Sequence, residues 1–284
     1  MSTFSITDQP VQKINRLKDI VICPGCKGEL GFDIKQIRCL ECGSVYSISR
    51  GVPLLCAEQE VPLEGRGHRK STEYALNYQT VERAKRYNLK YRKQPFKKWS
   101  THRELRLLRH FLKDQPDCGI ILDIPSGGGR LSEPLAEKAK LLLEADVAVG
   151  QVLYGLSLSP GRDHQVWINA SAFHLPLGPG SVDGAVCIRL SHHLASPEER
   201  ERLLREMIRV SKSFTIFSFF DFYSLKNVLR RIRRPIDGKE PKKTMKYSRV
   251  AAIAREEGAT LRFCPRLSVI GSGHRYALLL KDRS

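Results

Sequence analysis

A glycine-rich turn at residues 120–130 constrains the fold of this chain more than any other feature of its sequence. The apolar run Ile120-Ile121-Leu122 ends at Asp123, and three glycines follow at residues 127–129. A buried strand that feeds a glycine turn and then a helix lets the backbone approach a ligand, and the first N–H groups of the helix face that ligand. The pattern predicts an α/β domain with a binding site at the carboxyl end of the strand.

The sequence after this turn alternates between expected strands and expected helices. We expect helices at 131–140, at 197–210 and at 248–257, and strands at 141–146, 182–188, 214–220, near 261 and at 276–280. A basic helix and loop should follow the strand at 214–220. Ser196, Pro197 and Glu199 form a capping box with a first-turn proline, which predicts the start of the second helix. Residues 71–113 also show a helical pattern. Strands that alternate with helices predict a mainly parallel sheet with helices on both faces.

Two sequence blocks at the start of this region resemble the class I methyltransferases of type 11. Residues 122–129, LDIPSGGG, are similar to the first motif of that family. The resemblance implies that Asp123, Ser126, Gly127 and Gly129 line the methionine part of S-adenosylmethionine. Asp146 ends the next apolar run, where the family has an acid that binds the two ribose hydroxyls, and one carboxylate can accept hydrogen bonds from both.

Two further blocks extend the resemblance toward the C-terminus. Residues 169–177, NASAFHLPL, resemble the family segment beside the adenine, which implies that Ser171 and Ala172 lie there. Residues 181–194, SVDGAVCIRLSHHL, resemble the strand and turn that carry paired histidines. All four blocks stand in family order and at family spacing. They imply a Rossmann-like class I methyltransferase sheet with helices on both faces and S-adenosylmethionine as methyl donor.

Four of the eight cysteines form two closely spaced pairs near the N-terminus. Twelve residues separate the pair Cys23 and Cys26 from the pair Cys39 and Cys42. Two tight turns of this kind bring four thiolates to one tetrahedral ion at about 2.3 Å, and a site with four protein ligands is structural rather than catalytic. Zinc is the expected metal, with iron or an oxidised cysteine pair as alternatives. So small a module has too little core to fold without a metal.

The ribbon sequence itself resembles known zinc modules. Residues 23–30, CPGCKGEL, and 38–55, RCLECGSVYSISRGVPLL, are similar to the N-terminal part of a bacterial 23S rRNA guanine-N1 methyltransferase family. They are also similar to the small Trm112-like proteins that accompany methyltransferases. We therefore expect a zinc ribbon at 1–56, a linker and basic helical segment at 57–114, and the methyltransferase domain at 115–284.

The formal charge of +18 comes from two segments. Residues 83–109 hold eleven Lys or Arg and one acid, and residues 226–249 hold ten Lys or Arg and two acids, net charges of +10 and +8. Such localisation predicts a polyanionic partner, either RNA or an anionic membrane surface. Two solvated helix faces are the alternative. Tyr87, Tyr91 and Trp99 interleave with the Lys and Arg residues at 83–109, where they could stack on the nucleobases of RNA or pack against other helices.

Three residues are candidates for catalysis. Methyl transfer is an in-line displacement in which the protein mainly aligns the reactants, although an N–H acceptor also needs its proton removed. His192 and His193 follow the expected strand at 182–188, and Asp221 follows the next one. Each is placed where the acceptor should meet the methyl donor. The alternative for the histidines is that they pack as a feature of the turn.

The expected function is methylation of a base in RNA, most simply in rRNA. A methyltransferase for a small molecule, lipid or glycan is the first alternative. An inactive binding protein is the second, because Pro125 and Ser171 stand where the family usually has Gly and Asp. No apolar run approaches the roughly 20 residues that cross a bilayer, and residues 1–19 lack a secretory signal, so we expect a cytoplasmic protein. The sequence does not indicate the oligomeric state.

Overall fold

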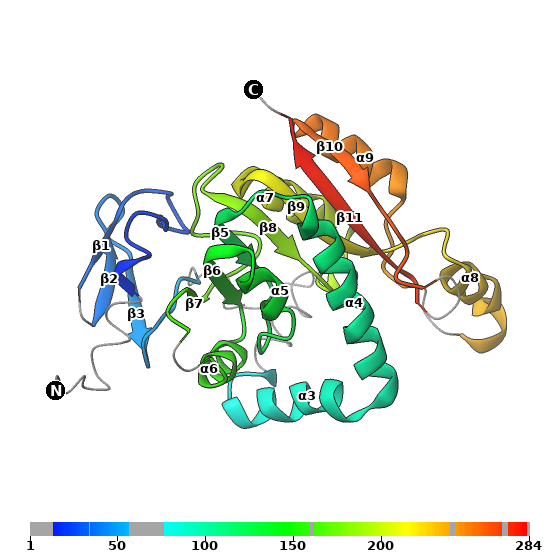
Figure 1. Ribbon diagram of the computed structural model, residues 1–284, viewed down its shortest axis with the longest axis horizontal. Helices are drawn as coiled ribbons and strands as arrows, with labels where there is room; N and C mark the ends of the chain where they lie inside the picture. The colour runs from blue at the N-terminus through cyan, green and yellow to red at the C-terminus, as the bar shows by residue number, and fades with distance from the viewer. Residues whose placement is uncertain are drawn as a thin grey trace.

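The computed structural model describes residues 14–33, 35–56, 77–159, 162–238, 242–268 and 272–282. A seven-stranded sheet forms its centre, in the order β10-β11-β9-β8-β5-β6-β7 (Figure 1). The strands are β5 (Cys118–Asp123), β6 (Ala139–Asp146), β7 (Gln165–Asn169), β8 (Val182–Cys187), β9 (Ser211–Phe220), β10 (Ala259–Phe263) and β11 (His274–Lys281). Strands β5 to β9 run parallel, whereas β11 pairs antiparallel with both β9 and β10. The expected mainly parallel sheet is confirmed.

Helices cover the two faces of the sheet in separate groups. The first face carries α4 (Pro95–Lys113), α5 (Ser132–Ala136) and α6 (Val149–Ser157), with α3 (Val81–Lys93) packed against α6. The second face carries α7 (Pro197–Val210) and α9 (Tyr247–Glu256). The remaining elements, η2 (Ser191–His193) and α8 (Leu225–Asp237), follow the carboxyl ends of β8 and β9. That edge of the sheet therefore gathers the loops available for a site.

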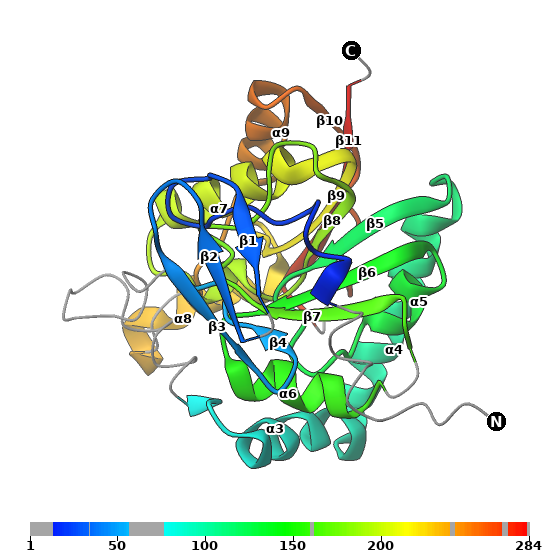
Figure 2. The ribbon, with the colours of Figure 1, turned by 90° about the vertical axis from the view of Figure 1, so that its left-hand side faces the viewer.

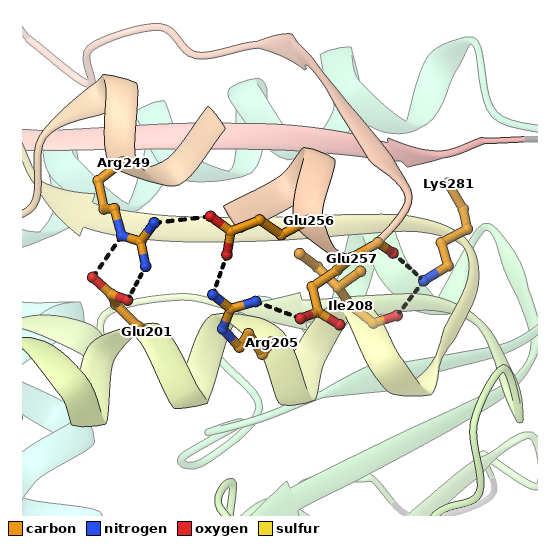
Figure 3. A network of polar contacts seen from close by, with 7 residues as sticks. All are labelled: Glu201, Arg205, Ile208, Arg249, Glu256, Glu257 and Lys281. Atoms are coloured by element: carbon orange, nitrogen blue, oxygen red, sulfur yellow. Dashed lines mark hydrogen bonds and ion pairs between the residues drawn. The ribbon is translucent and has the colours of Figure 1, made fainter. Parts of the chain in front are cut away.

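Figure 3 shows the ion pairs that join α7 to α9 on the second face. Arg205 pairs with Glu256 and Glu257, and Arg249 pairs with Glu201 and again with Glu256. Glu256 thus bridges the two arginines. Because the pairs share partners, the network fixes the relative position of the two helices better than isolated surface pairs would.

The N-terminal ribbon covers the rest of the second face at the β7 edge (Figures 1 and 2). Its antiparallel strands are β1 (Leu30–Phe32), β2 (Gln36–Cys39), β3 (Val45–Ser49) and β4 (Val52–Pro53). A connection between parallel strands usually contains a helix, but residues 170–181, which join β7 to β8, contain none. The ribbon packs there instead: Ile22 N–H donates to Pro176 O at 3.0 Å, and Lys27 Nζ donates to Leu175 O at 2.9 Å.

Two expected helices differ from those observed. The helix expected at 71–113 is two helices, because Gln94 precedes Pro95 and takes an extended conformation with ψ of 119°. Residues 71–76 and the linker expected at 57–70 lie outside the described residues. The helix expected at 131–140 ends at Ala136, and Ala139 already begins β6, because Leu142 pairs across the sheet with Ile121. The capping box at Ser196 and Glu199 is confirmed.

Candidate active site and zinc centre

The glycine-rich loop lies between the carboxyl end of β5 and the start of α5. Gly127 and Gly129 have φ angles of +57° and +74°, a conformation that L side chains rarely adopt. A Cβ atom on Gly129 would lie 2.8 Å from the Oγ of Ser132 and 3.1 Å from the indole ring of Trp167. On Gly127 the nearest atom would be 4.0 Å away. Gly129 therefore serves close packing inside the domain, whereas a Cβ atom on Gly127 would make only an ordinary contact, with Gln151 Oε1.

Asp146 ties this loop to the end of β6. Its Oδ2 atom accepts a hydrogen bond from Gly127 N–H at 3.0 Å, and its Oδ1 atom accepts one from Ala148 N–H at 2.9 Å. Burial raises the pKa of the carboxyl to about 6, against the lowering effect of these N–H donors. Each oxygen keeps a second lone pair, so the carboxylate can still accept two further hydrogen bonds.

A pair of neighbouring carboxyl groups, those of Asp123 and Glu144, lies behind the loop. Asp123 and Glu144 are partners across β5 and β6, and both are buried. Burial, followed by the nearby Glu144, raises the pKa of Asp123 well above its ordinary value, and burial raises the pKa of Glu144 to about 7. Asp123 and Ser126 both face the Glu144 carboxyl, but no hydrogen bond of ordinary geometry reaches the carboxyl oxygens of Asp123 or the Oγ atom of Ser126 among the described residues. Because buried polar atoms are nearly always paired, these groups suit a polar ligand.

The end of β7 completes this edge. Asn169 Nδ2 donates to the carbonyl oxygens of Asp146 and Val147 at 2.8 and 2.9 Å. These bonds bring the loop with Ser171 and Ala172 beside Asp146, and the Oγ atom of Ser171 accepts from Phe173 N–H at 3.2 Å. The structure thus brings together the seven residues expected at the methyl-donor site along one edge of the sheet.

The ribbon contacts the same edge through its last residues. Leu55 N–H donates to Asn169 O at 2.8 Å, and Leu54 forms a parallel bridge with Asn169. One asparagine therefore binds the ribbon through its backbone and the β6 loop through its side chain. The ribbon supports the loop that follows Asp146.

The four ribbon cysteines converge as expected for one metal ion. All four sulfur atoms lie within 4.8 Å of one another, with Cys23 to Cys42 at 3.8 Å and Cys26 to Cys39 at 3.4 Å. Four sulfurs at about 2.3 Å from a tetrahedral zinc ion would lie about 3.8 Å apart. The N–H groups of Gly28 and Cys42 point at the sulfurs of Cys26 and Cys39, each at 3.4 Å. Such donors stabilise thiolate charge, so the cluster fits zinc.

A cluster of aromatic rings lies further along the carboxyl edge. The ring of His192 lies 4.2 Å from His193, 4.5 Å from Phe220 and 5.0 Å from His274. Burial lowers the pKa of His192 to about 2 and that of His274 to about 3, with nearby cationic groups adding to the effect. The Nδ1 atoms of both rings are buried and have no partner among the described residues. The two imidazoles are therefore neutral at ordinary pH and offer unpaired polar atoms.

A buried ion network borders this cluster. Glu104 of α4 is fully buried and pairs with Arg130 and with Arg189, the latter at 2.6 Å between Oε1 and Nε. Tyr276 donates its hydroxyl to the same carboxylate. Burial alone would raise the pKa of Glu104, but the two arginines and the tyrosine hold it below its ordinary value. Since Arg130 follows the glycine-rich loop and Arg189 follows β8, the network joins α4 to both strand ends.

Asp221 does not have the surroundings of a catalytic base. Its carboxylate accepts hydrogen bonds from Arg275 Nε at 2.8 Å, Arg266 Nε at 3.2 Å and Tyr223 N–H at 3.0 Å. These donors outweigh burial and lower its pKa, whereas a general base needs a pKa near the working pH. In this structure Asp221 holds β11 and the segment before it against the end of β9, and its role in catalysis stays a prediction.

Comparisons with known proteins match this geometry. Residues 122–219 fit a family model described as a methyltransferase domain. A UPF0434 protein of Shewanella baltica is 42% identical over 50 residues, which are 17% of this chain and 85% of the relative, and one of Shewanella oneidensis is 40% identical over the same length. The chain contains a methyltransferase domain. Its N-terminal ribbon belongs to the UPF0434 family.

Solved structures share the fold at low sequence identity. The magnesium protoporphyrin IX methyltransferase ChlM of Synechocystis PCC 6803, with bound SAH, superposes with a TM-score of 0.61 at 17% identity, over 74% of this chain and 99% of that one. A chain from the complex of the Haloferax volcanii Trm112 methyltransferase activator with a methyltransferase gives 0.53 at 12% identity, over 78% and 100%. The fold and the sequence family together make this chain an S-adenosylmethionine-dependent methyltransferase.

Sequence reasoning missed several residues of the methyltransferase site. Glu104 could have been singled out from the sequence, because it is the one acidic residue among eleven Lys and Arg residues at 83–109. The sequence around Arg189 and His274 does not indicate a role in the site. Their contacts come from α4, β9 and η2, which lie far away in the sequence. No helix within the described residues of the enzyme is long and apolar enough to cross a membrane.

Proposed function

We propose that this methyltransferase binds S-adenosylmethionine along the carboxyl edge of β5, β6 and β7 and methylates an acceptor held beside His192 and His274. The observation that carries the proposal is the pairing of Gly127 with Asp146. The backbone of Gly127 is half-buried and uncrowded, and the Asp146 carboxylate beside it keeps two unused lone pairs. A ribose with two adjacent hydroxyls matches this acceptor.

The other residues of the edge take the remaining parts of the methyl donor. We assign Asp123 and Ser126 to the methionine side, because their unpaired polar atoms lie behind the loop, and Gly129 keeps the turn that holds them closely packed. We assign Ser171 and Ala172 to the adenine, because Asn169 fixes their loop beside Asp146. The ribbon, through Leu55, stabilises this loop within the same chain. That role resembles the one printed in the name of the Trm112 methyltransferase activator.

The reaction needs little covalent help from the protein. A lone pair of the acceptor attacks the methyl carbon, the carbon–sulfur bond breaks, and its electrons neutralise the sulfonium to give S-adenosylhomocysteine. The acceptor then releases its proton. Because their pKa values are far below neutrality, His192 and His274 are weak bases, and we assign them to hydrogen bonding and positioning of a neutral acceptor group.

RNA is the first candidate acceptor, as the charge of the chain suggests. Trp99 and Phe96 are 44% and 74% exposed at the start of α4, and the guanidinium of Arg103 lies 5.0 Å above the ring of Trp99. Exposed aromatic side chains among basic residues suit stacking on nucleotides. Tyr87 and Tyr91 do not contribute, because their rings pack together at 5.5 Å and their hydroxyls lie 3.2 Å apart.

A lipid or another amphiphilic molecule is the second candidate acceptor. It is favoured by the exposed aliphatic side chains of α8, since Ile232 and Ile236 are 65% and 88% exposed. RNA is contacted mainly through phosphates, 2′-hydroxyls and stacked bases, whereas acyl chains cover an aliphatic stripe directly. Only four residues separate this helix from Phe220, the last residue of β9, so the helix lies close to the proposed acceptor site.

Methyl incorporation from labelled S-adenosylmethionine tests the proposal. Purified enzyme is incubated with total RNA and with a total lipid extract, each taken from a strain that lacks the gene. We expect label in one of the two fractions, and at least about tenfold less of it with an Asp146→Ala variant at low S-adenosylmethionine concentration. Equal labelling by that variant, or no label in any fraction or in a small-molecule extract, would contradict the assignment.

A further inference from the structure

Helix α8 displays its apolar side to solvent. Leu225, Leu229, Ile232 and Ile236 follow one another at spacings of four, three and four residues, which places them on one face of the helix. At about 100° per residue they fall within an arc of about 60°. They are 49%, 40%, 65% and 88% exposed, and with Tyr223 they supply five of the twelve large exposed hydrophobic residues in the described part of the chain.

The side of α8 that faces the protein is the polar side. Ser224 caps the helix by accepting from Asn227 N–H, and both residues are almost fully buried. Asn227 Nδ2 donates to Asp221 O at 2.8 Å, and Arg231 donates to Phe222 O at 2.7 Å while its guanidinium lies 3.9 Å above the Phe222 ring. A helix in a globular protein normally buries its apolar stripe. In α8 the polarity is reversed, and among the described residues the stripe stays exposed, which leaves it available to a partner.

The charge of α8 indicates which partner. Residues 225–237 contain five Lys or Arg and one acid, a net charge of +4. An apolar stripe flanked by basic residues is the composition of helices that lie in the interface of an anionic membrane, with apolar side chains among the acyl chains and basic ones at the headgroups. RNA phosphates would pair with the basic side chains of α8 and leave its aliphatic stripe in water. The combination therefore favours a lipid surface over a nucleic acid.

We propose that α8 docks this methyltransferase on an anionic membrane surface, where the enzyme takes an amphiphilic acceptor directly from the lipid phase. The position of the helix supports this. Asn227, in the first turn of α8, donates a hydrogen bond to Asp221 O, and Asp221 N–H donates to the carbonyl oxygen of Gly273, which directly precedes His274. Docking through α8 holds the proposed acceptor site close to the membrane. Figure 1 shows α8 projecting from the body on the side away from the ribbon, so the ribbon does not cover it. This inference rests on the proposed function for its acceptor, but the docking itself does not.

Vesicle flotation with the full-length, zinc-loaded protein tests the docking. One set of vesicles is phosphatidylcholine alone and the other also contains phosphatidylglycerol. The test variant is Ile232→Ser with Ile236→Ser, which removes apolar surface and leaves the charge unchanged. The matched control is Val45→Ser with Leu158→Ser, two aliphatic residues that are 47% and 40% exposed elsewhere on the surface.

We expect the wild type and the control to float with the anionic vesicles, and the test variant to bind them about a hundredfold more weakly, as expected for the loss of two buried isoleucines. Added salt should weaken the binding of the wild type. Calorimetry with S-adenosylhomocysteine should give the same affinity for all three proteins, which separates this proposal from the proposed function. Activity on the lipid extract should fall in the test variant and persist in the control.

Three results would overturn the proposal. One is wild-type protein that does not bind anionic vesicles. Another is an isoleucine variant that binds vesicles as well as the wild type. The third is self-association or rRNA-fragment binding that the isoleucine substitutions abolish, without any vesicle binding by the wild type, which would assign the stripe to a second copy of the chain or to RNA.

Discussion

Substitution of Glu104 by alanine tests the buried ion network most sharply. Glu104 is fully buried, and its carboxylate serves Arg130, Arg189 and Tyr276 at once. The side chains of the two arginines are 17% and 24% exposed, so water replaces the lost carboxylate poorly. Removal of one partner of a buried ion pair leaves an uncompensated charge, which costs about 3–5 kcal/mol. We expect Glu104→Ala to lower the free energy of unfolding by that amount.

Urea unfolding followed by circular dichroism provides the measurement, with Glu133→Ala as matched control. Glu133 pairs with Arg109 at 3.2 Å, but the two side chains are 64% and 46% exposed, so the loss of this pair should cost at most about 1 kcal/mol. Glu104→Gln keeps the volume and one acceptor, and should fall between the two. A Glu104→Ala protein that is no less stable than Glu133→Ala would refute the reasoning.

The same network has a pH dependence with a defined sign. The pKa of Glu104 is lower in the folded protein than its ordinary value, so its ionised form stabilises the fold. This contribution is complete above the unfolded-state pKa of about 4.3 and is lost as the pH falls through the folded-state pKa. Acid should therefore destabilise the wild type more steeply than Glu104→Gln, and parallel curves would contradict this.

Three further predictions follow from the site. Metal analysis should find about one zinc per chain, and Cys39→Ser should lose it; a well-folded ribbon without metal would contradict the zinc centre. Because burial raises the pKa of Asp146 to about 6, affinity for S-adenosylhomocysteine should fall as the pH drops through 6, whereas a flat profile would remove Asp146 from the pocket. Leu55→Pro deletes the N–H that binds Asn169 O and should weaken the same affinity several-fold, roughly the worth of one hydrogen bond; unchanged affinity would separate the ribbon from the methyl-donor site.

Much of the α/β domain could be predicted because its signals are local. The glycine turn, the apolar runs and the capping box at Ser196 each depend on residues a few positions apart, and each appears where expected. The predicted ends of helices and strands were wrong where pairing between distant strands decides them. Residues 139 and 140 have a helical pattern, but β6 extends through them because it lies between β5 and β7.

The ribbon and the acceptor side could not be predicted in the same way. Nothing in residues 14–56 indicates that they cover the face left open by the connection between β7 and β8, because that gap exists only in three dimensions. The charge pattern of α8 was visible in the sequence, but not the direction of its apolar stripe. Periodicity defines the face of a helix and leaves open whether that face meets the core or solvent.

Calorimetric titration with S-adenosylhomocysteine tests the central claim, that the glycine-rich edge of this sheet binds the methyl donor. The wild type should bind with one site per chain. Asp146→Ala should bind about 10- to 100-fold more weakly, as expected for the loss of a charged acceptor of two hydroxyls. Gly127→Arg forces a bulky side chain onto a φ of +57° in the loop and should abolish binding. Wild-type affinity in both variants would contradict the site, and absence of binding by the folded wild type would contradict the claim itself.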